Sequence, residues 1–166
     1  DFLAAFSGRI APGVHVDTGW QYDPNFNRTE RFNAGGRYQP EPGKVLNASY
    51  RYTRDQFRQV DLSGQWPIAG GWHGVGRYNY SILERRLVEG VAGLEYDGGC
   101  WVARVVLHRL ATTADKSSTS FFVQLELNGL ARIGSNPLDM LKRNVVGYGV
   151  ISQPTVTAST SASRPK

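Results

Sequence analysis

The chain has 166 residues, a length typical of one domain, and a formal net charge of +5. No segment approaches the roughly 18 consecutive apolar residues that a transmembrane helix needs, which excludes a helical membrane protein. The 4 Trp, 8 Tyr and 7 Phe exclude disorder over most of the chain. A single cysteine, Cys100, excludes an internal disulfide framework and a cysteine-cluster metal site. Because the chain begins at Asp1 without a methionine or a signal sequence, we expect a processed product or a piece of a longer protein.

Turn signals recur along the chain with a nearly constant period. Glycine turns end at residues 13, 43, 71 and 99, so that they are 28 to 30 residues apart. A more polar break lies between each pair, as at residues 23–27. Gly and Pro break a chain in this way when hairpins repeat. The sequence therefore predicts a series of antiparallel hairpins.

The segments between the breaks alternate between apolar and polar residues, which is the signature of a strand. In one of them Leu46, Ala48 and Tyr50 alternate with Asn47 and Ser49. The pattern predicts an all-β, up-and-down antiparallel fold with about nine long strands: 2–10, 14–23, 28–38, 44–53, 57–66, 72–81, 85–96, 100–111 and 119–130.

Two features favour a transmembrane barrel over a soluble β-sandwich. The predicted strands have 9 to 12 residues, whereas soluble strands usually have about 5–6 and membrane-spanning strands about 9–11. Aromatic residues lie near the strand ends on the apolar side, as in the girdles that outer-membrane barrels place at both interfaces. The predicted girdle residues are Trp20, Tyr22, Tyr38, Tyr50, Tyr52, Trp66, Trp72, Tyr78, Tyr80, Tyr96 and Trp101.

A sheet in lipid must close on itself, because every backbone polar group needs a partner. Single-chain outer-membrane barrels have even strand numbers, so nine strands predict a fragment of a larger barrel. The short glycine turns are then periplasmic and the polar breaks extracellular, which leaves the C-terminus in the periplasm. We expect barrel strands over 1–130, a periplasmic extension with a helical turn near 138–143 over 131–150, and a disordered tail over 151–166.

The polar side of the strands is expected to face a water-filled lumen, where charges are tolerated. Three histidines lie on this side without metal-ligand spacing, and no serine, histidine and aspartate arrangement is indicated. We expect no enzyme activity, no cofactor and no nucleic-acid binding. The lumen-facing residues are predicted to include Arg31, Arg37, Arg51, Asp61, Arg77, Glu89, Glu95, Arg104 and Glu126.

Several longer motifs stand out along the predicted strands: YRYTRDQ at 50–56, QVDLSGQWP at 59–67, GRYNYS at 76–81, LEYDGGCWVAR at 94–104 and FFVQLELNGL at 121–130. Together they resemble the C-terminal barrel of the LPS-assembly protein family LptD. The resemblance covers roughly residues 1–148, and its last two motifs are specific.

The resemblance implies a barrel of the Gram-negative outer membrane that receives lipopolysaccharide from a periplasmic LptA-like bridge through an N-terminal domain. It also implies an LptE-like lipoprotein plug. Family members form interdomain disulfides from a cysteine pair that corresponds to Gly99 and Cys100, so this chain retains one candidate, Cys100. By the same resemblance the strand at 119–130 closes the barrel beside a lateral seam, with Phe121, Val123, Leu125 and Leu127 as its apolar residues.

The sequence thus predicts part of an LptD-like translocon that inserts lipopolysaccharide into the outer leaflet. The alternative is a passive porin-like or adhesin-type barrel, which the remainder of the full-length protein would distinguish. A soluble sandwich is a third alternative, and it predicts a chain that stays in solution without detergent.

Overall fold

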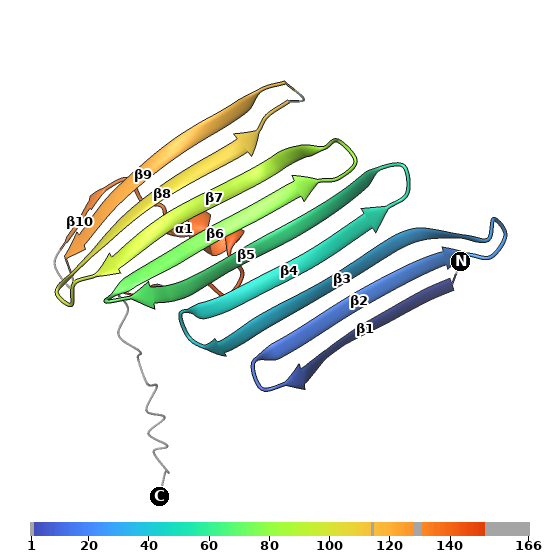
Figure 1. The fold of residues 1–166 in the computed structure, drawn as a ribbon, viewed down its shortest axis with the longest axis horizontal. Coiled ribbons are helices and arrows are strands. Elements are labelled where there is room, and N and C mark those ends of the chain that lie inside the picture. The colour runs from blue at the N-terminus through green and yellow to red at the C-terminus, as the bar shows by residue number, and fades with distance from the viewer. Residues whose placement is uncertain (1, 114, 128–130, 152–166) are drawn as a thin grey trace, which may run out of the picture.

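The computed structural model describes residues 2–113, 115–127 and 131–151. Within these residues ten antiparallel strands form one open sheet, and their order in space is their order in the chain (Figure 1). The predicted all-β meander is confirmed. The strands are β1(Phe2–Ala11), β2(Val14–Asp23), β3(Arg28–Glu41), β4(Lys44–Thr53), β5(Phe57–Ala69), β6(Trp72–Ser81), β7(Arg86–Asp97), β8(Trp101–Ala111), β9(Ser117–Leu127) and β10(Ala131–Gly134).

The hairpins are closed by two kinds of turn at opposite ends of the strands. At the short turns Gly13 and Gly43 have φ of 75° and 81°, a left-handed conformation that glycine adopts without a steric penalty. At the other end Asn27 and Asp55 have φ of 48° and 54°, and these residue types tolerate that region better than most. The alternation of turns agrees with the spacing of the glycine and polar breaks in the sequence.

The strand register separates the sheet into two chemically different faces. Leu46, Gly64, Gly76, Ala92 and Leu107 lie opposite one another on successive strands. Leu46 and Leu107 remain 48% and 46% exposed, so this side, the apolar face, has no covering layer among the described residues. The charged residues of the alternate positions lie on the opposite side, the polar face.

The tenth strand was not predicted. The ninth was expected to continue to residue 130, but β9 ends at Leu127, and residues 128–130 lie outside the described part of the chain. Ala131–Gly134 then folds back antiparallel onto β9, with Ala131 opposite Leu127 and Gly134 opposite Gln124. Residues 152–166, nearly all of the expected disordered tail, also lie outside the described residues.

The C-terminal segment, residues 135–151, contains helix α1(Leu138–Asn144), where a helical turn was expected. Asp139 in its first turn and Lys142 and Arg143 in its last turn complement the helix dipole. No helix in the described residues is long and apolar enough to cross a membrane. The segment covers part of the polar face through a small apolar core formed by Val45, Val75, Val91, Val106, Met140, Leu141 and Val145.

We predict that Leu141→Ala in the full-length protein loosens the C-terminal segment. Leu141 is fully buried, and truncating such a leucine costs about 2–5 kcal/mol. Limited proteolysis should cleave the variant faster within residues 135–151. Lys142→Ala, which alters the exposed neighbour, is the matched control. Equal cleavage rates for the two variants would contradict the packing described above.

Candidate functional site on the polar face

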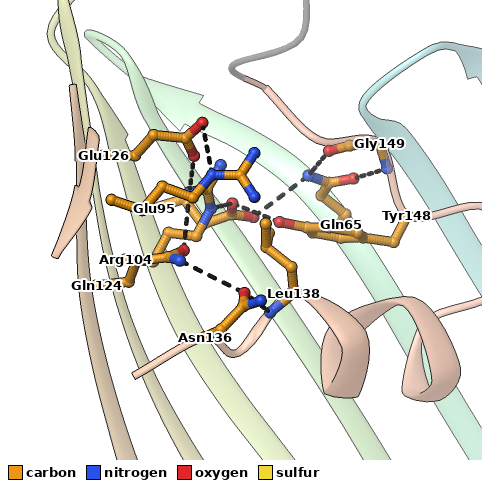
Figure 2. A network of polar contacts seen from close by, with 10 residues as sticks. Gln65, Glu95, Arg104, Gln124, Glu126, Asn136, Leu138, Tyr148 and Gly149 are labelled. Atoms are coloured by element: carbon orange, nitrogen blue, oxygen red, sulfur yellow. Dashed lines mark hydrogen bonds and ion pairs between the residues drawn. The ribbon is translucent and has the colours of Figure 1, made fainter. Parts of the chain in front are cut away.

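A buried polar network crosses β7, β8 and β9 near the glycine turns. The register places Arg104 between Glu95 and Gln124. Its Nε lies 3.0 Å from Glu95 Oε2, and its Nη1 lies 2.8 Å from Glu126 Oε2 and 3.1 Å from Gln124 Oε1 (Figure 2). Arg104 and Glu95 are fully buried. A second cation, Arg132 on β10, lies 3.2 Å from Glu126 Oε1, so two arginines face two glutamates.

The C-terminal segment adds its own polar groups to this network on the polar face of the sheet. Tyr148 donates its hydroxyl proton to Glu95 Oε2 at 2.6 Å. The side-chain amide of Gln65 and the backbone of Gly149 exchange two hydrogen bonds, both of 2.9 Å (Figure 2). Asn136 accepts a hydrogen bond from Gln124, at 3.4 Å, and one from the first backbone N–H of α1. The segment is therefore held by polar contacts at both of its ends as well as by the apolar core.

A second charged cluster lies further along the strands, toward the polar turns. Arg77 binds Asp61 through two nitrogens, with the shorter contact at 2.6 Å, and lies 3.3 Å from Glu89. His108 Nε2 lies 2.8 Å from the other oxygen of Glu89. Arg77 also donates to Asn144 Oδ1 of α1 at 2.8 Å. This cluster likewise joins the sheet to the C-terminal segment.

The structure thus gathers six of the nine predicted lumen residues into two clusters. Asp61, Arg77 and Glu89 form one of them, and Glu95, Arg104 and Glu126 form the other. Arg31, Arg37 and Arg51 belong to neither cluster, and no ion pair of theirs occurs among the described residues. Metal-binding groups of three or more His, Cys, Asp or Glu are also absent from that part of the chain.

The predicted girdle residues form ring contacts at both ends of the apolar face. Toward the glycine turns Tyr96 lies between Trp72 and Trp101, with ring centroids 4.8 and 5.1 Å away. Tyr38 and Trp66 stack at 6.3 Å near the same end. Contacts near the polar turns are Trp20–Tyr22, Phe32–Tyr50 and Tyr78–Tyr80.

The predicted seam residues lie on the apolar face of β9, where Phe121 is 61% and Leu127 is 37% exposed. The outer edge of β9 is paired along only part of its length. β10 pairs with residues 124–127, and Ser135 binds the backbone of Val123. Residues 117–122 have no described strand beyond them. Cys100, also predicted as a functional residue, is exposed in the turn that precedes β8, with its thiol free.

Sequence reasoning missed the residues that hold the C-terminal segment. They include Gln65, Gln124, Asn144 and Tyr148. A signal was available, because valines at positions 45, 75, 91 and 106 interrupt the polar side of the strands. Leu138, Leu141 and Val145 also recur at the spacing of one helix face, which is typical of a helix that docks on such a patch.

A long-stranded meander with one apolar and one polar face defines the class of protein: a segment of a β-barrel wall. A family model described as "LptD: LPS transport system D" matches residues 1–72. The LPS-assembly protein LptD of Aromatoleum aromaticum is 56% identical over 93% of this chain, and that of Azoarcus sp. is 53% identical over 93%. The counterpart in Chromobacterium violaceum is 38% identical over 92%. The chain belongs to the LptD family, and it spans about one fifth of the length of these relatives, 20%, 20% and 21% respectively.

We predict that Arg104→Met strongly destabilises the full-length barrel, because Glu95 and Glu126 would keep buried charges without their main partner. Breaking a buried ion pair in this way costs about 3–5 kcal/mol. The temperature at which the folded, compact band disappears in semi-native electrophoresis should fall. Arg54→Met is the control, since its partner Asp55 is 91% exposed. A midpoint that shifts no further for Arg104→Met than for Arg54→Met would refute this prediction.

Docking of the C-terminal segment is predicted to weaken at alkaline pH. Burial raises the pKa of Tyr148, and the negative charge of Glu95 raises it further. A raised pKa stabilises the docked state below the ordinary phenol value of about 10, and this contribution is lost as the pH rises above it. Hydrogen exchange of residues 138–149 should accelerate above that pH. Tyr148→Phe, which cannot ionise, should remove this step and should exchange faster at neutral pH.

Proposed function

We propose that the chain forms part of the wall of an outer-membrane translocon that inserts lipopolysaccharide into the outer leaflet. Membership of the LptD family indicates an outer-membrane location. The observation that carries the proposal is the 56% identity to an LPS-assembly protein over 93% of the chain. The separation of the two faces supports it, because a saccharide needs a polar path while acyl chains need an apolar surface.

In the proposed orientation the glycine turns and the C-terminus lie in the periplasm. Trp72, Tyr96 and Trp101 then form the inner aromatic girdle, and Trp20, Tyr78 and Tyr80 belong to the outer one. Their ring contacts, and the exposure of Trp20, Trp72 and Tyr78, support this assignment, since an indole or phenol prefers a site with one wet and one dry edge. The polar face would line the lumen.

Lipid would leave through a lateral opening between β9 and the first strand of the complete barrel. β10 would occupy the periplasmic half of the β9 edge, so among the described residues of β9 only 117–122 remain to pair directly across the seam. A short ladder has few hydrogen bonds to break, which supports opening of the seam in the outer half of the membrane. Transport by this route needs neither catalysis nor a cofactor.

The proposed partners are an LptE-like lipoprotein in the lumen and an LptA-like periplasmic bridge that meets the N-terminal domain. The C-terminal segment already covers the polar face of β4 to β9 through the contacts with Asn47, Gln65, Arg77, Glu95 and Gln124. A lumen plug would therefore contact the part of the polar face that the segment leaves uncovered, toward β1. The same cover disfavours a passive porin, because it narrows the water-filled path.

Depletion of the full-length protein from its bacterium tests the function directly. Newly made lipopolysaccharide should stop reaching the cell surface, as measured by its modification with an outer-leaflet enzyme. Uptake of a small hydrophilic solute should not fall in parallel. A loss of solute uptake with normal lipopolysaccharide delivery would favour the porin-like alternative.

We further predict that Cys100 forms an interdomain disulfide in the full-length protein. The thiol is exposed at the periplasmic rim of the proposed orientation, and the periplasm is an oxidising compartment. Non-reducing peptide mass mapping should find Cys100 joined to a cysteine outside this chain, and Cys100→Ser should change the non-reducing electrophoretic mobility. A free thiol on Cys100 in protein purified without reductant would overturn the disulfide.

A further inference from the structure

A hollow of about 290 Å³ lies on the polar face between the sheet and the C-terminal segment. The hollow forms where Gly35 of β3 pairs with Ser49 of β4, because glycine has no side chain and the side chain of serine is small. Longer side chains surround this pair. Arg37 lies two residues along β3 from Gly35, and Arg51 lies two residues along β4 from Ser49.

The charges that line the hollow are not balanced. Arg37, Arg51, Arg77 and Arg143 face it together with Asp17 and Asp61, which leaves an excess of two positive charges. Arg77 and Asp61 neutralise each other at 2.6 Å. The remaining arginines have no carboxylate partner among the described residues, since Arg37 donates to Asn47 and Arg143 to a backbone carbonyl.

We propose that this hollow binds a phosphoryl group carried on a sugar. Guanidinium groups bind phosphate oxygens through paired, charge-assisted hydrogen bonds, and three arginines from different elements converge here. Arg37 and Arg51 come from neighbouring strands, whereas Arg143 comes from α1. The complete site therefore exists only while the C-terminal segment is docked.

Asp17 gives the hollow a second chemical feature. Its carboxylate lies over Gly35, because a Cβ built on that glycine would be 2.8 Å from Asp17 Oδ1. A carboxylate repels phosphate but accepts hydrogen bonds from sugar hydroxyl groups. A phosphorylated sugar places hydroxyl groups beside its phosphate, which matches an aspartate at one side of an arginine cluster. Free phosphate would leave Asp17 without a donor.

The proposal rests on the proposed function, because lipopolysaccharide is the phosphorylated saccharide that such a lumen would carry. It goes beyond that function by assigning three residues to one chemical group of the cargo. The arginines act here as binding residues during passage, and no bond is made or broken.

The test uses the full-length protein in its own outer membrane, with a photo-crosslinking amino acid in place of Ser63, which lines the same hollow. Light should join the protein to lipopolysaccharide, detected by immunoblot. Replacing both Arg37→Gln and Arg51→Gln should lower the crosslinked yield by about tenfold, the value of one or two charged hydrogen bonds. Arg31→Gln is the matched control, because Arg31 belongs to the same polar side but lies outside the hollow.

A second experiment identifies the source of the phosphate by measuring the crosslinked yield with purified protein. It compares intact lipopolysaccharide with the same lipopolysaccharide after dephosphorylation, and it adds inorganic phosphate as a competitor. Dephosphorylation should lower the yield as much as the arginine replacements do. An unchanged yield with dephosphorylated lipid overturns the proposal, and displacement by millimolar phosphate assigns the hollow to the free ion instead. Delivery of lipopolysaccharide to the cell surface is measured in parallel. If delivery is normal and the crosslinked yield does not change when Arg37 and Arg51 are replaced, the site alone is overturned. If the wild type delivers no lipopolysaccharide, the proposed function is overturned.

Discussion

The rest of the structure depends on the two-residue period of the strands combined with an antiparallel ladder that is continuous except near the strand ends. Each strand presents one set of side chains to either face, so a register shift by one residue would exchange the faces. The register from β4 to β8 keeps Leu46, Gly64, Gly76, Ala92 and Leu107 in one row. Bulges interrupt the pairing only near the strand ends, as between Gln21 and Tyr22 or Pro67 and Ala69. The two faces consequently keep their separate characters across the sheet.

The polar face shows how the charged side of a sheet can still contain an apolar core. Four valines on this face form an apolar patch that needs a cover, and the C-terminal segment supplies Met140, Leu141 and Val145. On either side of the patch the segment meets charged clusters around Arg77 and Arg104. Apolar packing gives the docking its free energy, and the hydrogen bonds of Tyr148 and Asn144 fix its position. The result is a polar face of which one part is covered by the chain itself.

Strand order, most strand limits and the two faces could be predicted from the sequence, because each depends on local periodicity and turn chemistry, although β3 and β5 extend three residues further than expected. Leu46 to Tyr52 carries its own pattern, and Gly43 marks its own turn. The clusters depend on pairing between strands, so the contact of Arg77 with Asp61 becomes visible only once the register is known. β10 could not be predicted, because a strand of four residues is too short for an alternating pattern to be recognised.

The return of β10 onto β9 also bears on how the complete barrel assembles. An unpaired strand edge is a template for association with other chains, and natural sheets protect such edges by covering them. Here β10 covers residues 124–127 of the β9 edge, with Arg132 adding a charge there. Among the described residues, 117–122 of β9 then keep an unpaired outer edge, and β10 presents a second, short edge beyond the covered part of β9. Edge-to-edge association at this side of the sheet is then limited to two short stretches, that of β9 and the four residues of β10.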